Sequence, residues 1–195
     1  MTETRSAREQ ILETAARLFY QYGYRAVGVD TIIAESGVAK MTLYRHFPAK
    51  DDLIVAYLER SGAAFWNWLE TLIKDEPDAR KQLELIYEAV ANRAVNAACL
   101  GCTFMAAALE FPEFDHRAHA VALEYKKSVL ARLTELSRQA GAKNPEALGG
   151  GLMLLMDGAW SAARMFGPGS HADKVSDAAK TLIAAAIDQT PTRPR

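Results

Sequence analysis

The sequence predicts an all-α protein of about nine helices. Apolar residues recur at the three- to four-residue spacing that places them on one side of a helix, and no alternating run of β-branched residues favours a strand. Glycine and proline interrupt this pattern where helices are expected to end. The expected helices cover residues 11–22, 29–36, 40–47, 51–73, 79–98, 103–110, 116–140, 145–166 and 172–188.

Residues at the expected helix ends support these boundaries. Gly23 follows the first apolar stripe, and a glycine there suits the left-handed backbone that often ends a helix. Asp51 and Asp52 lie in the first turn of the fourth helix, where the positive end of the helix dipole favours them. Asn144 is a good N-cap because it accepts a hydrogen bond from a free backbone N–H, and Pro145 suits the first helical position.

The composition is typical of a globular protein with one or two domains. The chain has 195 residues, of which half are apolar and 24% are charged, and its formal net charge is -1. Such a composition does not favour disorder. The longest apolar stretches, such as residues 149–156, are much shorter than the ~20 residues that span a bilayer, and the first residues are unlike an export signal. We therefore expect a cytoplasmic protein with no membrane partner.

Cys99 and Cys102 are the two cysteines of the chain. They cannot form the disulfide framework of a small secreted domain, and no histidine lies at a spacing that would complete a zinc site with them. We interpret them as buried structural thiols at a helix junction, with a thiol sensor and a metal site as alternatives. The sequence therefore predicts no metal and no cofactor.

The sequence contains none of the common catalytic motifs. There is no glycine-rich phosphate loop, no G-x-S-x-G nucleophile elbow and no H-E-x-x-H metal motif. No other spacing of acidic residues and histidines indicates a reaction centre. We therefore expect a binding protein with no catalytic residues.

Residues 30–50 carry the clearest functional pattern. Two short helices joined by a tight turn that contains Gly37 form a helix-turn-helix, which presents its second helix to the DNA major groove. Leu43 and Phe47 are four residues apart and mark the inward side of that second helix. The side chains expected to point outward or to flank the outward side are Met41, Thr42, Tyr44, Arg45 and His46.

These outward groups are chemically suited to DNA. Hydroxyls and the planar guanidinium of Arg45 fit base edges, whereas Lys40 and Lys50 offer charges to phosphate oxygens. The first 50 residues contain seven lysines and arginines against five acidic residues, while the rest of the chain is slightly acidic. This small basic excess gives weak additional support to nucleic-acid binding.

The residues of this region also resemble a known family. Residues 37–53 read GVAKMTLYRHFPAKDDL and are similar to the DNA-binding signature of the TetR family of bacterial transcriptional regulators. Further likeness in the first two helices extends the resemblance over about residues 8–58. It implies a three-helix DNA-binding domain over residues 1–50, a helical ligand-binding and dimerisation domain over 51–190, and a flexible tail over 191–195.

The resemblance also implies roles for individual residues. Two positions depart from the family pattern, because Gly28 and Ala49 stand where a capping Ser or Thr is usual; a poor cap destabilises a helix by about 1 kcal/mol or less here. The resemblance implies base-edge or nearby contacts for Lys40, Met41, Thr42, Tyr44 and Arg45, backbone contacts for Tyr44, His46 and Lys50, and a further contact for Thr31 near the start of the second helix.

The C-terminal part of the chain is rich in aromatic and methionine side chains with few charges among them. Such residues either fill a helical core or line an apolar pocket. The resemblance favours a pocket for a small, moderately hydrophobic effector. The residues expected to line this pocket are Trp66, Phe104, Met105, Leu109, Tyr125, Met153, Met156 and Trp160.

Three consecutive glycines, at positions 149–151, lie inside an expected helix, where each is destabilising by roughly 1 kcal/mol relative to alanine. Close approach of another helix is the simplest compensation. The resemblance implies that the last two long helices pair with their copies in a homodimer, and packing within one chain is the alternative. The expected interface residues are Gly150, Ala159, Ala162, Ala163, Ala179, Leu182, Ile183 and Ala186.

The sequence thus predicts a DNA-binding transcriptional regulator. The favoured form is a homodimeric repressor that a small, moderately hydrophobic ligand releases from a near-palindromic operator in double-stranded DNA. Two alternatives stay open. One is a helical small-molecule sensor or carrier whose N-terminal domain docks a protein partner, and the other is a TetR-like activator.

Overall fold

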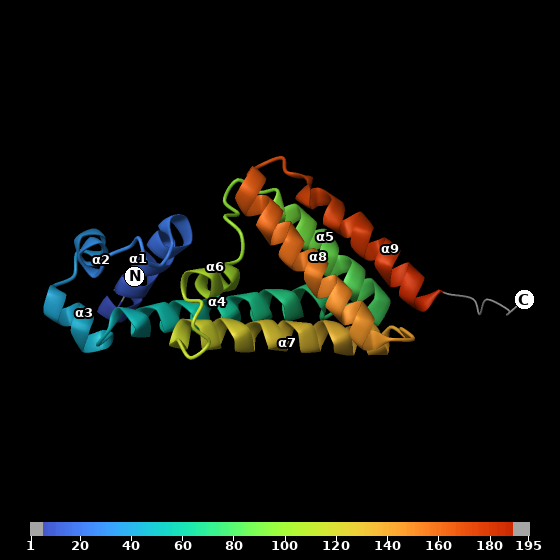
Figure 1. Cartoon of the computed structure of the whole chain (residues 1–195), viewed down its shortest axis with the longest axis horizontal. Helices are drawn as coiled ribbons and strands as arrows, with labels where there is room; N and C mark the ends of the chain where they lie inside the picture. Colours follow the sequence, from blue (N-terminus) through green and yellow to red (C-terminus); the bar gives the residue numbers. More distant parts are fainter. Residues whose placement is uncertain (1–5, 189–195) are drawn as a thin grey trace, which may run out of the picture. The chain divides into compact units, whose positions relative to one another are not determined.

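The all-α prediction is confirmed by the computed structural model, which describes residues 6–188 and contains no strand in that range (Figure 1). The predicted tail at 191–195 lies outside the described residues. The helices are α1 (Ala7–Tyr22), α2 (Val29–Ser36), α3 (Lys40–His46), α4 (Lys50–Ile73), α5 (Ala79–Ala94), α6 (Thr103–Glu110), α7 (Arg117–Gln139), α8 (Pro145–Phe166) and α9 (Val175–Ile187), with a 3₁₀-helix, η1, at His171–Lys174.

Two compact packing units make up the described chain. The first contains residues 6–64 and 103–125, and the second contains residues 65–102 and 126–188. Helices α4 and α7 each contribute one segment to each unit. These packing units are not the two functional domains that the sequence suggests. The division into a DNA-binding domain over residues 1–50 and a ligand-binding and dimerisation domain over 51–190 stays a prediction.

The first unit is built around the three short N-terminal helices. Ser6 caps α1 by accepting a hydrogen bond from the Glu9 backbone N–H at 3.2 Å. Gly37 has a φ of 69°, and its N–H bonds to the Ile33 carbonyl, so a residue without a Cβ ends α2 at the left-handed turn before α3. The buried apolar side chains of these helices and of the start of α4 are Ile11, Leu12, Ala15, Leu18, Phe19, Ile32, Leu43, Phe47, Leu53, Ile54 and Leu58.

The two unusual caps behave differently. Gly28 precedes α2 and gives it no side-chain hydrogen bond. At the start of α4, Asp52 accepts a hydrogen bond from the Ala49 backbone N–H at 2.9 Å. That bond is the return half of a capping box, so the third helical residue compensates in part for the missing side chain at Ala49.

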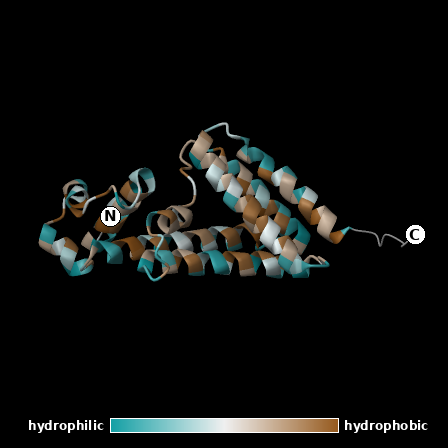
Figure 2. Cartoon of the chain, viewed as in Figure 1, coloured by the Kyte–Doolittle hydropathy of each residue, from teal (hydrophilic) through white to brown (hydrophobic). Residues whose placement is uncertain are grey.

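In the second unit, α5, α8 and α9 pack against one another in a layer that Figure 1 shows clearly. Apolar residues recur along these helices at the helical period and are separated by polar ones, as the hydropathy colours of Figure 2 show. Tyr87 is buried at the centre, and its hydroxyl donates to the Leu152 carbonyl. Among the buried side chains are Leu83, Ile86, Tyr87, Val90, Leu152, Met156, Ala179 and Ile183.

The glycines of α8 permit close helix packing, as the sequence suggests for this stretch. A Cβ on Gly149 would lie 2.8 Å from the Thr134 Cα in α7, which the backbone could not accommodate without a shift. A Cβ on Gly151 would lie 2.8 Å from Leu182 Cδ2 in α9. Gly150, in contrast, has open space around its Cα.

Two helix ends differ from the prediction. Helix α5 stops at Ala94 because Asn96 forms a local turn, in which its side-chain oxygen accepts from the Ala98 N–H and its carbonyl accepts from the Cys99 N–H. Helix α9 is preceded by η1, which Ser170 caps through the Ala172 N–H. Among residues 6–188, no helix combines the length and apolar character needed to cross a bilayer.

Candidate nucleic-acid interface

The outward side of α3 is the side that the sequence predicts. Leu43 and Phe47 are 1% and 2% exposed, so they anchor α3 on its inward side. Met41 is 80% exposed and Tyr44 is 39% exposed, and Arg45 is exposed as well. Thr42 and His46 are half-buried beside them, and Lys40 and Thr31 are exposed. The structure therefore brings the predicted DNA-contacting residues of α3 to one solvent-facing side, although their roles in binding stay predictions.

Lys40 is held across the turn between α2 and α3. Its Nζ lies 3.2 Å from Asp30 Oδ1, and both side chains are largely exposed. An exposed ion pair contributes about 0–1 kcal/mol, so a phosphate oxygen could replace Asp30 as the partner of Lys40 at little free-energy cost. Lys40 is thus available to a polyanion.

Lys50 differs from the other predicted phosphate contacts because it is half-buried at the start of α4. Burial lowers the pKa of Lys50 below its ordinary value, the carboxylates of Glu110 and Asp51 oppose this shift, and the charge of Arg25 adds to it. The ammonium group therefore already interacts with acidic side chains. A phosphate would have to compete with them.

Helix α1 holds the helix-turn-helix in place from behind. The Gln10 side-chain amide donates to the Ser36 carbonyl at the end of α2, and Arg17 forms an ion pair with Glu35. The Arg8 guanidinium lies over the Phe47 ring at 5.1 Å from its centroid. These contacts fix both helices of the motif against α1, so α3 is presented on a rigid support.

Glu110, at the end of α6, is a contact that the sequence analysis missed. Its carboxylate accepts hydrogen bonds from the backbone N–H groups of Tyr24, at 3.0 Å, and Arg25, at 2.6 Å, and its carbonyl accepts from Arg25 Nε at 2.6 Å. A Cβ on Gly23 would lie 2.8 Å from the Glu110 carboxylate oxygen, so glycine leaves room for this cap. No local pattern reveals a contact between residues about 86 positions apart.

The other end of α6 also contacts the segment after α1. The Tyr24 hydroxyl donates to the Thr103 carbonyl at 2.9 Å, and the Thr103 hydroxyl donates to the Tyr57 oxygen at 2.8 Å. The rings of Phe19, Tyr24 and Tyr57 pack together with centroids 5.4–6.0 Å apart. Both ends of α6 are therefore bonded to the loop that leads into the helix-turn-helix.

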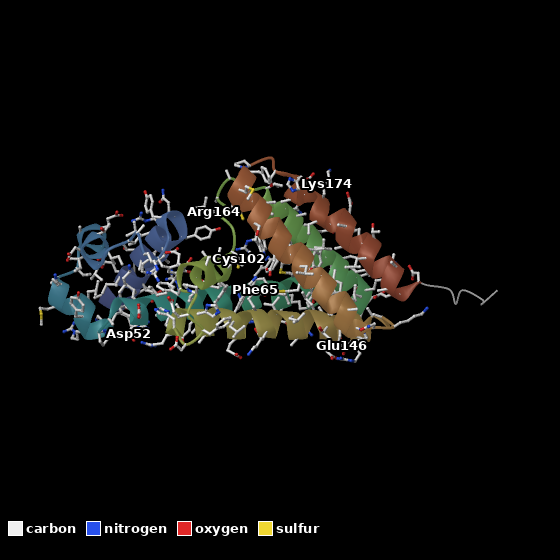
Figure 3. All side chains as sticks on the ribbon, in the orientation of Figure 1. Asp52, Phe65, Cys102, Glu146, Arg164 and Lys174 are labelled. Carbon is white, nitrogen blue, oxygen red and sulfur yellow. The ribbon has the colours of Figure 1, made fainter. Side chains whose placement is uncertain are left out.

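The start of α4 is paired with the start of α7. Arg117 donates to Asp52 at 2.6 Å, and Figure 3 shows where Asp52 lies in the first turn of α4. The Arg117 hydrogen bond, followed by the one from the Ala49 N–H, lowers the pKa of Asp52. His116 stacks on Phe111 with centroids 4.2 Å apart and lies 3.6 Å from Asp51. The start of α4, which follows the helix-turn-helix, thus contacts residues that lie about 65 positions further along the chain.

The predicted pocket residues divide equally between the two units. In the first unit, Phe104 and Tyr125 stack with ring centroids 3.5 Å apart, whereas Leu109 is 79% exposed and faces solvent. Met105 is half-buried there. In the second unit, Met153 and Met156 are buried, and Trp66 and Trp160 are half-buried. The pocket itself stays a prediction.

The predicted interface residues of α8 and α9 lie mostly in the interior of the second unit. Gly150, Leu182 and Ala186 are half-buried, and the other five pack inside the chain. These five, with exposures between 0% and 8%, are Ala159, Ala162, Ala163, Ala179 and Ile183. These five side chains therefore pack within one chain, which is the alternative that the sequence left open. Their part in a dimer stays a prediction.

The two cysteines are only partly buried, which corrects the interpretation as buried thiols. Cys99 and Cys102 are both free and half-buried in the link between α5 and α6. Burial of a side chain in a link depends on distant elements, which local spacing does not reveal. Within residues 6–188, no cluster of three or more His, Cys, Asp or Glu side chains is arranged to hold a metal ion.

The fold and this surface define a class of protein, the helical regulators that carry a helix-turn-helix. Residues 11–57 match the family model described as bacterial regulatory proteins of the tetR family. The chain is 33% identical to SCO4454, a TetR-family transcriptional regulator from Streptomyces coelicolor, whose crystal structure it matches with a TM-score of 0.84 over 92% of this chain and 93% of that one. The chain belongs to the TetR family of transcriptional regulators.

Other relatives agree with this assignment. A putative TetR-type regulator from Streptomyces avermitilis is 29% identical, with a TM-score of 0.83 over 95% of this chain and all of that one. The regulator YxaF from Bacillus subtilis is 32% identical over 97 residues, which are 49% of this chain and 51% of that protein. The chain spans about half the length of this curated relative, so the match does not transfer the activity of the whole protein.

Proposed function

We propose that this protein is a DNA-binding transcriptional repressor of the cytoplasm, with no enzymatic activity. The observation that carries the proposal is the outward side of α3, where exposed Lys40, Tyr44 and Arg45 surround the half-buried Thr42. These groups match base edges and phosphates, and α1 supports the helix rigidly from behind. A helix that docks a protein partner would favour exposed Leu or Phe at positions 42 and 45, so DNA is the better-supported partner.

The proposed operator is a near-palindrome read by a homodimer. Two-fold symmetry places the two α3 helices of the dimer, its reading helices, in successive major grooves, about 34–36 Å apart or somewhat more. A small, moderately hydrophobic effector would weaken DNA binding if it preferred a dimer in which this separation is wrong, and only to the extent of that preference. The lining residues predicted from the sequence are the first positions at which to seek the effector site.

The exposed side of α8 is the best-supported dimer surface. Gly150 and Gly158 have open space around them, although each glycine destabilises the helix interior by roughly 1 kcal/mol relative to alanine. Packing within the chain does not compensate for this cost, but close approach of a second copy would. Leu154 and Met165 lie on the same helical side and are 74% and 76% exposed.

An activator is the second candidate function. It is favoured by a match of 34% identity over 82 residues to the HTH-type transcriptional activator FasR from Mycolicibacterium smegmatis, which covers 42% of this chain and 37% of that protein. Repressor and activator share the reading helix and the dimer, and they differ in where the operator lies relative to the promoter. A reporter placed behind the natural promoter separates them, since deletion of the regulator raises expression for a repressor and lowers it for an activator.

Selection of random double-stranded oligonucleotides with the purified full-length protein tests the proposal directly. We expect enrichment of one near-palindromic sequence whose half-sites are separated by about one helical turn of DNA or slightly more. Enrichment of no sequence at low ionic strength would contradict DNA binding, because the electrostatic part of the affinity is strongest under that condition.

A further inference from the structure

Cys99 and Cys102 have no role in the proposed mechanism of DNA binding. They are the chain's two cysteines, they lie three residues apart, and both are free and half-buried. Neither fills the core, and no third metal ligand joins them within the described residues. We propose that they form a reversible intramolecular disulfide, and that closure of this bond lowers the affinity for DNA. The second part rests on the proposed function.

Closure of a disulfide between Cys99 and Cys102 would require the backbone of the link to change course. A disulfide requires Cα atoms about 4.4–6.8 Å apart, which for residues three positions apart is the span of a tight turn. Residues 99–102 form neither helix nor turn in the structure, whereas the segment just before them turns at Asn96. Gly101 lies between the cysteines with a φ of 92°, a conformation that glycine adopts readily and that many tight turns require.

The path of this link is fixed on one side by α8. A Cβ on Gly101 would lie 3.1 Å from both the Trp160 carbonyl oxygen and Arg164 Cβ, so the backbone of the link runs directly against that helix. Figure 3 labels Cys102 and Arg164. A turn closed by a disulfide cannot keep the present backbone path and this contact together without local adjustment. Oxidation would therefore change the contact between Gly101 and α8.

The next residue along the chain transmits the change. Cys102 is covalently followed by Thr103, whose carbonyl accepts the Tyr24 hydroxyl and whose own hydroxyl donates to Tyr57. At the far end of α6, Glu110 caps the backbone of Tyr24 and Arg25. A displacement of Cys102 thus reaches the loop before α2 through one peptide bond and one hydrogen bond. Closure of the disulfide would therefore act first on the hydrogen bonds of Thr103 that support the loop before the helix-turn-helix.

The chemistry needs a two-electron oxidant, and a low-molecular-weight disulfide is sufficient. One cysteine thiolate attacks a sulfur of the small disulfide, a mixed disulfide forms, and one small thiolate leaves. The second cysteine thiolate then attacks the protein sulfur of the mixed disulfide and expels the other small thiolate. Two cysteine thiols are thereby oxidised to one disulfide, and the small disulfide is reduced to two thiols that take up the two protons.

Thiol counting with oxidised glutathione as the probe tests the bond itself. We expect the full-length protein to lose both reactive thiols without gaining glutathione mass, to migrate as a monomer on a non-reducing denaturing gel, and to recover both thiols with a dithiol reductant. Cys99→Ser and Cys102→Ser should each retain one glutathione adduct, because the resolving thiol is absent. Unreacted thiols, stable adducts on the native chain, or cross-linked chains would each overturn the proposal.

Affinity for the selected operator tests the consequence. We expect the oxidised protein to bind about tenfold more weakly than the reduced protein, within the usual range of coupling between sites, and the double variant Cys99→Ser/Cys102→Ser to bind equally in both conditions. Equal affinity of the native protein before and after oxidation would overturn the regulatory role. Failure of the reduced protein to bind any DNA would instead refute the proposed function, while the thiol count would still decide whether the disulfide forms.

Discussion

At the residue scale, Arg45 is the outward side chain best able to distinguish base pairs. Its exposed guanidinium can donate two parallel hydrogen bonds to guanine in the major groove. We expect Arg45→Ala to relax the preference at one base-pair position of each half-site by about 1–3 kcal/mol. Repeating the oligonucleotide selection checks this. Arg138→Ala, which removes another exposed arginine in α7, is the control; an unchanged motif in both variants would exclude Arg45 from base readout.

Lys50 should act on affinity and not on sequence preference. We expect Lys50→Ala to weaken binding evenly across sequences and to reduce the slope of log affinity against log salt by about 1 or less. This reduction in slope is smaller than for a lysine without acidic neighbours, because Glu110 and Asp51 already interact with the Lys50 ammonium group. Titrations with the operator and with an unrelated duplex at several salt concentrations measure both quantities. A loss confined to the operator would assign Lys50 to base readout.

Residue directions on α3 could be predicted from the sequence, whereas residue burial elsewhere often could not. Leu43 and Phe47 face inward because the helical period alone separates the two sides of a short helix. The exposure of Cys99 and Cys102 depends on the path of a link, which no period describes. The inward position of Ala179 likewise depends on how α9 rests on α5 and α8. Local periodicity therefore predicts which side of a helix faces inward, but it does not predict which distant elements cover that side.

At the element scale, the attachment of α6 to the loop after α1 is a testable support of the DNA-binding helices. We expect Glu110→Ala to destabilise the protein by about 1 kcal/mol, since two backbone N–H groups lose their partner. We also expect weaker operator binding at temperatures where the variant is fully folded. Glu110→Gln should have a smaller effect, because an amide oxygen still accepts a hydrogen bond.

The matched control is Glu113→Ala, which removes an exposed carboxylate three residues further along. Thermal unfolding followed by circular dichroism and operator titration give the two readouts. If both variants bind the operator as the native protein does, α6 does not position the helix-turn-helix.

The junction of α4 and α7 predicts a pH effect. The pKa of Asp52 is lowered in the folded protein by Arg117 and then by the Ala49 N–H. A lowered carboxyl pKa contributes stability above the ordinary value of 3.8, and this contribution is lost as the pH falls through the lower folded value. We therefore expect the midpoint of thermal unfolding of Asp52→Asn to fall less than that of the native protein between pH about 5 and about 3. Parallel curves for the two proteins would show that the pair with Arg117 does not affect stability.

Within residues 6–188, the existence of each α-helix could be predicted from the sequence, whereas the 3₁₀-helix η1 and the contacts that position the elements could not. Asn144, Pro145 and Gly37 mark helix ends through local chemistry, and the structure uses each of them in that way. Helix α5 ends earlier than expected because the Asn96 turn competes with the helix. The bond between Glu110 and Tyr24 spans 86 positions of sequence, and only the tertiary packing of the first unit brings the two together.

At the scale of the whole molecule, the proposed function requires two copies of the chain, and the exposed side of α8 provides the test. Leu154 is 74% exposed, so a charge there leaves the fold of one chain intact. At the centre of an apolar interface between two copies, the same charge would be buried without a partner. We expect Leu154→Glu to shift the protein from dimer to monomer in sedimentation velocity and to weaken operator binding at least tenfold.

Leu130→Glu is the matched control for this variant, because it adds the same charge at an exposed leucine of α7, which is 39% exposed and belongs to no predicted site. It should remain dimeric and bind the operator as the native protein does. A dimeric Leu154→Glu with native affinity would move the interface away from α8. A native protein that is monomeric at every concentration would contradict the paired reading helices, since a single short helix in one groove cannot recognise both halves of a near-palindrome.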